Sequence, residues 1–62
     1  MIGEKIAQLR KEKGLTQKDL AGETRLSRGY IAAIEEGGIP RVKTVAMIAK
    51  ALGVEARELY EE

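Results

Sequence analysis

Apolar residues recur at helical spacing along the whole chain. Near its start they follow an i, i+4, i+7 pattern at Ile2, Ile6 and Leu9. Farther on, one helix face carries Val42, Val45, Ile48 and Leu52. No segment alternates apolar and polar residues in the manner of a half-buried strand. The pattern predicts an all-α domain, a five-helix bundle with helices over about residues 2–13, 17–24, 28–36, 42–52 and 56–61.

Capping residues mark the ends of these helices. Thr16 and Asp19 have the spacing of a capping box, and Ser27 is the expected N-cap of the third helix. Gly14 and Gly53 stand where helices end. Only about two residues separate the second helix from the cap of the third, so these helices must cross steeply rather than lie antiparallel. The spacing predicts a helix-turn-helix.

The composition excludes most kinds of chemistry. The chain has 62 residues, enough for one domain, and it contains neither cysteine nor histidine. We therefore expect no disulfide, no metal site and no cofactor. The one serine, Ser27, is already assigned as a cap and has no histidine to activate it, so we expect no catalytic residue and no enzyme.

Charge and hydropathy narrow the remaining possibilities to binding. No apolar run approaches the length of a membrane span and no signal peptide opens the chain, so we expect a soluble, cytoplasmic protein. The net charge is only +1. Residues 1–44 carry nine Lys and Arg against six Asp and Glu, whereas residues 45–62 carry two against four. The basic surplus thus lies in the part that holds the helix-turn-helix.

The ordered motifs resemble those of a known family. They are Leu15-Thr16-Gln17, Leu20-Ala21, Leu26-Ser27-Arg28, Tyr30-Ile31, Ile34-Glu35 and Gly37, followed by Pro40, residues 48–54 and Glu58-Leu59; the opening Met1-Ile2-Gly3 also fits. The set resembles the Cro and phage-repressor type of regulator, the xenobiotic-response-element family. The resemblance implies a lambda-repressor-like fold that binds palindromic DNA operators as a homodimer, with the third helix in the major groove.

The same resemblance assigns base reading to Arg28, Gly29, Ala32 and Ala33. An arginine at position 28 can bond the O6 and N7 atoms of guanine; the alternatives are a phosphate contact or no contact. Gly29 and Ala33 stand where the family usually has polar side chains. Either the backbone approaches DNA closely there, with alanine methyls against thymine, or reading is reduced.

Phosphate contacts are implied for Thr16, Gln17, Ser27, Tyr30, Arg41 and Lys43. Gln17 has a solvated surface position as its alternative, and Tyr30 a purely packing role. Arg41 and Lys43 lie at the expected start of the fourth helix, where the helix dipole disfavours cations. Two cations at that end favour an anion as their partner.

Three further assignments follow from the resemblance. Arg10 and Glu35 match an ion pair between the first and third helices, although they can also be independent surface charges. Arg25 replaces the usual glycine of the turn, so either the turn is adjusted or strain is tolerated. A dimer contact is expected at or near Leu52, Val54, Leu59 and Tyr60, with ordinary core and rim as the alternative.

Two functions remain. The first is sequence-specific DNA binding by a small transcriptional regulator, a repressor, found on the nucleoid when bound. The second is a protein–protein interaction module on the same fold, with base reading reduced or lost.

Overall fold

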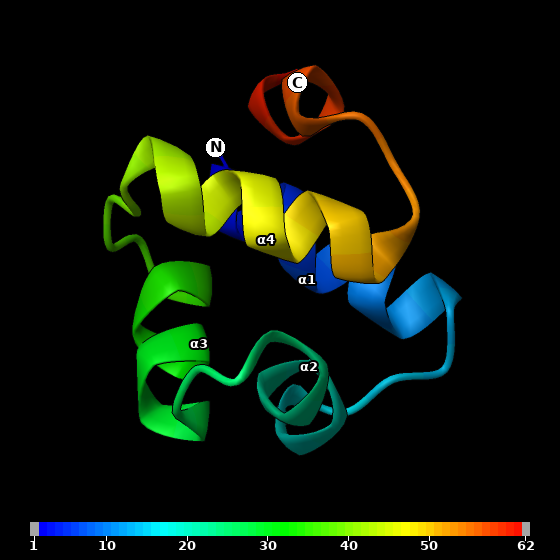
Figure 1. Cartoon of the computed structure of the whole chain (residues 1–62), viewed down its shortest axis with the longest axis vertical. Coiled ribbons are helices and arrows are strands. Elements are labelled where there is room, and N and C mark those ends of the chain that lie inside the picture. The colour runs from blue at the N-terminus through cyan, green and yellow to red at the C-terminus, as the bar shows by residue number, and fades with distance from the viewer. Residues whose placement is uncertain (1, 62) are drawn as a thin grey trace.

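The computed structural model describes residues 2–61; Met1 and Glu62, which end the predicted domain, lie outside the described residues. The elements are α1 (Ile2–Glu12), α2 (Gln17–Thr24), α3 (Arg28–Glu35), α4 (Val42–Leu52) and the 3₁₀ helix η1 (Ala56–Tyr60) (Figure 1). No residue between 2 and 61 belongs to a strand. None of the helices in this part of the chain is long and apolar enough to cross a membrane.

The four α-helices agree with the predicted ranges to within one residue at each end. The expected fifth helix differs, because η1 is a 3₁₀ helix of five residues. Its hydrogen bonds run from the Glu58 amide to the Glu55 carbonyl and from the Glu61 amide to the Glu58 carbonyl, an i→i+3 pattern. A count of five α-helices is therefore not confirmed within the described residues.

The predicted caps explain where α2 and α3 begin. Thr16 Oγ1 accepts from the Asp19 amide at 3.0 Å, and Asp19 Oδ2 accepts from the Thr16 amide at 2.9 Å. These bonds, the one from the Thr16 amide above all, lower the pKa of Asp19. Ser27 Oγ accepts from the Tyr30 amide at 3.0 Å. Each cap satisfies an amide that has no partner inside its own helix.

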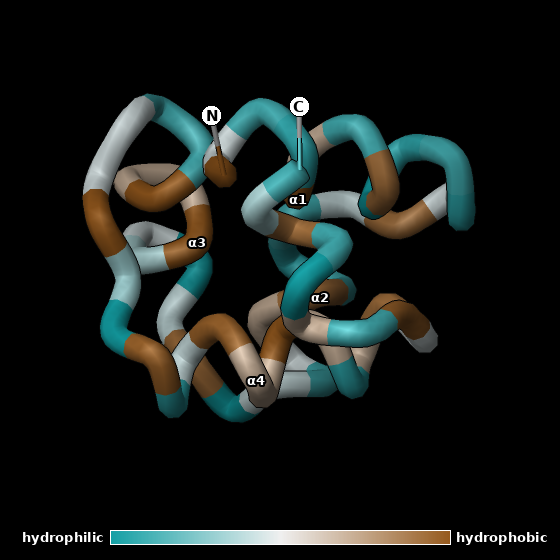
Figure 2. Tube along the Cα trace, turned by 90° about the horizontal axis from the view of Figure 1, so that it is seen from above, coloured by the Kyte–Doolittle hydropathy of each residue, from teal (hydrophilic) through white to brown (hydrophobic). Residues whose placement is uncertain are grey.

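The core is aliphatic and draws on every element. The largest fully buried side chains are Ile6, Leu20, Ile31, Ile34, Val45, Ile48, Leu52 and Leu59. Helix α1 packs against α3, α4 and η1, and α2 packs against α3 and α4. Figure 2 shows hydrophobic and hydrophilic residues following one another along each helix, as amphipathic helices around a shared core require.

Gly3 lets α1 approach α3 closely. A Cβ atom at this position would collide with the Ile34 carbonyl oxygen and lie 3.0 Å from the Glu35 Cα atom. Only glycine fits without a shift of one helix, so Gly3 fixes where α1 crosses the end of α3.

The predicted assignment to a dimer contact is wrong for two residues. Leu52 and Leu59 are both 0% exposed, because each points into the core of its own chain. A side chain with no surface cannot touch a second copy, so ordinary core packing is the correct interpretation for this pair. Val54 is half-buried against the core and Tyr60 is 57% exposed.

Candidate nucleic-acid interface

The turn between α2 and α3 keeps the sharp geometry of a helix-turn-helix without glycine. Arg25 adopts φ 62° and ψ 22°, the left-handed conformation, and its amide donates to the Ala21 carbonyl. The next amide, of Leu26, also reaches the Ala21 carbonyl, at 3.2 Å. Of the two alternatives for Arg25, the chain therefore tolerates the strain. Ala21 is 7% exposed, as a small residue at a close crossing should be.

Helix α3 buries one face and presents the other to solvent. Ile31 and Ile34 are buried, whereas Arg28, Gly29 and Ala33 are exposed. A Cβ atom built on Gly29 would meet nothing within 4 Å, so the core does not require glycine there. On the exposed face, Arg28 supplies the hydrogen-bond donors.

Ala32, the fourth predicted reading residue, is half-buried at the flank of this face.

Arg28 borders a cleft at the start of α2. The cleft has a volume of about 390 Å³, and Thr16, Gln17, Lys18 and Arg10 also line it. The structure thus brings together predicted residues from three helices, α1, α2 and α3, around a basic depression. Lys18 was missed from sequence, although its place beside Thr16 and Gln17 at a helix start was a usable signal.

The predicted ion pair between α1 and α3 is present. Arg10 Nε donates to Glu35 Oε2 at 2.7 Å, and a second guanidinium nitrogen donates to Oε1 at 3.0 Å. The side chains are only 9% and 7% exposed. Burial by itself raises the pKa of Glu35, but hydrogen bonds from Arg10 and Gln17 and attraction to Arg10 more than offset it, so the pKa is lowered. The hydrogen bond to Glu35 raises the pKa of Arg10.

Gln17 is tied to this pair. Its Nε2 donates to Glu35 Oε1 at 3.0 Å, and the residue is half-buried. The alternative of a merely solvated surface residue is therefore wrong. The bond joins the start of α2, at the basic cleft, to the buried carboxylate of α3. No spacing in the sequence indicated it, because it depends on how three helices meet.

The start of α4 lies beside α3 along one edge of the molecule (Figure 1). Tyr30 Oη and Thr44 Oγ1 are 3.5 Å apart, and Tyr30 is 37% exposed. Arg41 is the N-cap residue but its side chain makes no capping hydrogen bond. Arg41 and Lys43 are both exposed. Helix α4 thus begins with amides that the N-cap side chain does not cap and with two exposed cations.

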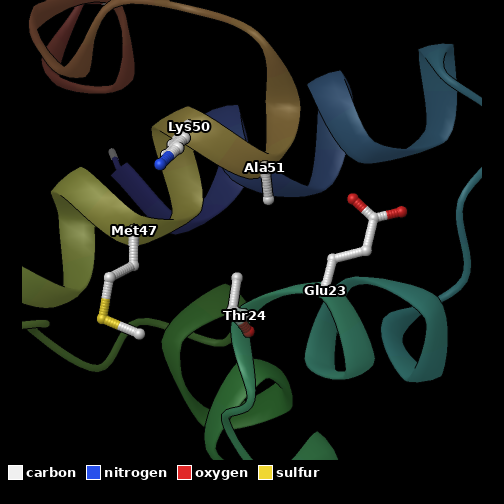
Figure 3. Close-up of a pocket in the computed structure, with 5 residues that line it drawn as sticks. All are labelled: Glu23, Thr24, Met47, Lys50 and Ala51. Atoms are coloured by element: carbon white, nitrogen blue, oxygen red, sulfur yellow. The ribbon is translucent and has the colours of Figure 1, made fainter.

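A second cleft of about 400 Å³ lies between α2 and α4, and none of the predicted site residues lines it. Figure 3 shows its lining residues, Glu23 and Thr24 of α2 and Met47, Lys50 and Ala51 of α4. The Thr24 hydroxyl is occupied, since it donates to the Leu20 and Ala21 carbonyls of its own helix. Among residues 2–61, no three carboxylate side chains gather closely enough to hold a metal ion.

Comparison with known proteins identifies the family. The helix-turn-helix family matches residues 6–59, nearly the whole chain. The chain belongs to the helix-turn-helix family. It is 40% identical over 60 residues to the HTH-type transcriptional regulator y4dJ of Sinorhizobium fredii, an alignment that covers 95% of this chain and 78% of that protein.

Other helix-turn-helix proteins are similar over the same length. The immunity repressor of Bacillus phage phi105 is 39% identical over 62 residues, 98% of this chain. The chain spans 43% of that repressor, which is therefore a longer protein.

Two solved structures share the fold. SinR of Bacillus subtilis, crystallised in complex with DNA, superposes with a TM-score of 0.93 at 30% identity, over 98% of this chain and 100% of that one. The restriction-modification controller C.AhdI of Aeromonas hydrophila gives 0.90 at 36% identity, over 94% and 89%.

In this helix-turn-helix domain, several of the predicted site residues fall into two groups. One group lies around the basic cleft at the start of α2, and the other around the start of α4. Ser27 caps α3, and its hydroxyl oxygen accepts from the Tyr30 amide. Val54 and Tyr60, by contrast, belong to the C-terminal segment and form no part of either group.

Proposed function

We propose that this helix-turn-helix domain binds double-stranded DNA sequence-specifically as a transcriptional regulator, a repressor, acting on the nucleoid in the cytoplasm. One observation carries the proposal. Arg28 stands exposed on the first turn of α3, at the edge of a cleft lined by Lys18 and the start of α2. The fold that presents it superposes closely on SinR, which was crystallised with DNA.

In the proposed complex α3 lies in the major groove and Arg28 bonds the O6 and N7 atoms of a guanine. Gly29 leaves open space through which the backbone can approach the bases. Ala33 and the flank of Ala32 offer methyl groups to thymine. Discrimination among bases then depends mainly on Arg28, because the other three side chains carry no hydrogen-bonding group.

Phosphates are held at both groups of residues. At the start of α2, the free amides and the side chains of Thr16 and Gln17 face one phosphate, with Ser27 and Tyr30 nearer the start of α3. At the start of α4, Arg41 and Lys43 neutralise another. The helix dipole makes the start of α4 unfavourable for cations and favourable for anions. A phosphate bound there would offset the repulsion between the dipole and Arg41 and Lys43.

Two copies occupy a palindromic operator, each with α3 in one half-site. A single copy carries a net charge of only +1 and one reading arginine, so pairing supplies the affinity. Of the residues first assigned to the dimer contact, Val54 and Tyr60 retain exposed surface and remain candidates.

The test is a binding titration against the best site selected from random duplexes and against its single-base variants. Arg28→Ala should lose about 1–3 kcal/mol of discrimination at one base pair per half-site, and keep much of its non-specific affinity. Lys50→Ala is the matched control, since it removes an exposed cation that lines the other cleft. Equal binding of the wild type to every variant would refute base reading at α3.

The second candidate is a protein–protein interaction module. The observation that favours it is the lack of polar side chains at Gly29 and Ala33 on the exposed face. A gel shift on random duplexes at low salt separates the two candidates, because a protein-binding module would cause no retardation.

A further inference from the structure

Two apolar side chains project into solvent where α3 connects to α4. Ile39 is 94% exposed and Val42 is 78% exposed, more than the other exposed large apolar residues in the described chain, Tyr30 and Tyr60. Between them stand the buried Pro40 and the exposed Arg41. We call Ile39 and Val42 the apolar edge.

The exposure of Ile39 is built into the connection. The Gly37 amide donates to the Ile34 carbonyl at 3.1 Å, and the Gly38 amide donates to the Ala33 carbonyl at 2.9 Å. Gly37 has φ 122°, a value that favours glycine. Pro40 is buried on the other side of Ile39. Because both neighbours are anchored, the backbone holds Ile39 outward.

The surroundings of the apolar edge are positive. Arg41 and Lys43 are exposed beside it, and the amides at the start of α4 lack a side-chain cap. Residues 37–54 contain no aspartate or glutamate; the nearest acidic residue before them is Glu36. Symmetric packing of this surface against a second copy would bring like charges together, whereas a polyanion complements it.

The edge also adjoins the proposed DNA-contacting groups. Thr44, in the first turn of α4, meets Tyr30 of α3 at 3.5 Å. Any duplex that lies along α3 and reaches the Arg41 and Lys43 cations must therefore pass next to the apolar edge. DNA offers apolar surface in its deoxyribose rings, and aliphatic side chains are known to pack into its minor groove.

We propose that Ile39 and Val42 pack against the sugar walls of the DNA minor groove, beside the phosphates held by Arg41 and Lys43. This inference rests on the proposed function. In this arrangement the apolar edge contributes to the affinity because binding removes its apolar surface from water. This contribution does not depend on salt, since an apolar contact releases no counterions from the DNA.

The test measures affinity for the best selected duplex over a series of salt concentrations. Ile39→Ser should weaken binding by about three- to tenfold at every salt concentration. Its log–log plot against salt should stay parallel to that of the wild type. Arg41→Ala should instead change the slope by about one unit. Ile39→Leu is the matched control and should bind like the wild type, and Val42→Ser should repeat the Ile39→Ser result. Urea melts should show an unchanged midpoint for Ile39→Ser, since the side chain is exposed in the free protein.

Each negative result of this experiment leads to a different conclusion. If the wild type retards no duplex, the proposed function fails and the inference falls with it. If the wild type binds but Ile39→Ser binds equally well, the inference alone is overturned. A loss of self-association by Ile39→Ser in sedimentation without DNA would also overturn it, because the apolar edge would then be a contact between copies.

Discussion

Replacing Arg10 by methionine should largely unfold the domain. The guanidinium donates to Glu35 at 2.7 and 3.0 Å and to the Leu15 carbonyl at 2.8 Å. Both charged side chains are less than a tenth exposed, so the change leaves a carboxylate that water reaches poorly. Removing one partner of a buried pair costs about 3–5 kcal/mol. At roughly 0.05–0.15 kcal/mol per residue, a domain of this length has only about 3–9 kcal/mol of stability.

Urea melts at neutral pH measure the loss. The double variant Arg10→Met with Glu35→Leu should recover much of it, because no buried charge remains. Gln17 then loses its acceptor, but as a half-buried residue it can bond water instead. Lys50→Met serves as the control for removing an exposed cation. If Arg10→Met alone costs under about 0.5 kcal/mol, the two charges are solvated in solution and the reasoning is wrong.

The pH dependence of stability provides an independent check on the Arg10–Glu35 pair. In the wild type the pKa of Glu35 is lowered by folding, so its contribution is present above the unfolded pKa, 4.5, and is lost as the pH falls through the folded value. In Arg10→Met, burial without the guanidinium should raise the pKa of Glu35 instead. Stability of this variant should then rise as the pH falls from neutral towards 4.5, whereas the contribution of Glu35 in the wild type stays constant over that range and is lost only below it. Equal pH slopes for the two proteins would contradict this account.

Three further predictions test other parts of the structure. Gly3→Ala should destabilise the domain by more than 1 kcal/mol, because its Cβ would collide with the backbone of α3; Gly22→Ala, which meets nothing within 4 Å, should instead stabilise it by up to about 1 kcal/mol in urea melts. Arg25→Gly should raise stability in thermal melts by about 1 kcal/mol by relieving the left-handed conformation, and a loss would mean that its side chain stabilises the turn. Arg41→Ala and Lys43→Ala should each lower affinity for selected and random duplexes alike and flatten the log–log salt dependence by about one unit; a changed base preference at constant slope would show base reading instead.

Local signals in the sequence were enough to locate the α-helices. Thr16 with Asp19, and Ser27, are caps whose effect depends on three or four consecutive residues, so spacing alone was sufficient to find them. The ion pair of Arg10 with Glu35 was different, because its residues are 25 positions apart. It came from the family resemblance, since no periodicity relates two positions on separate helices.

Features that depend on packing between elements escaped prediction. Leu52 and Leu59 lie near the ends of elements, where a rim position and a core position have the same sequence pattern, and they are buried because α4 and η1 pack against each other and against α1. The bond from Gln17 to Glu35 needs three helices to meet at one point. The last helix was expected to be α-helical because the sequence shows an apolar spacing but not which hydrogen bonds five residues will close.

The empty space around Gly29 has a consequence for how such a domain can acquire new targets. A side chain added at Gly29 would touch neither the core nor a neighbouring helix. Arg28 and Ala33 are also exposed and take no part in the core. Under the proposed function, substitutions at these three positions should alter recognition without destabilising the domain, and at Gly29 the added helix propensity should raise the melting temperature. A library randomised at all three should remain mostly folded, which makes the domain a convenient scaffold for selecting altered binding preferences.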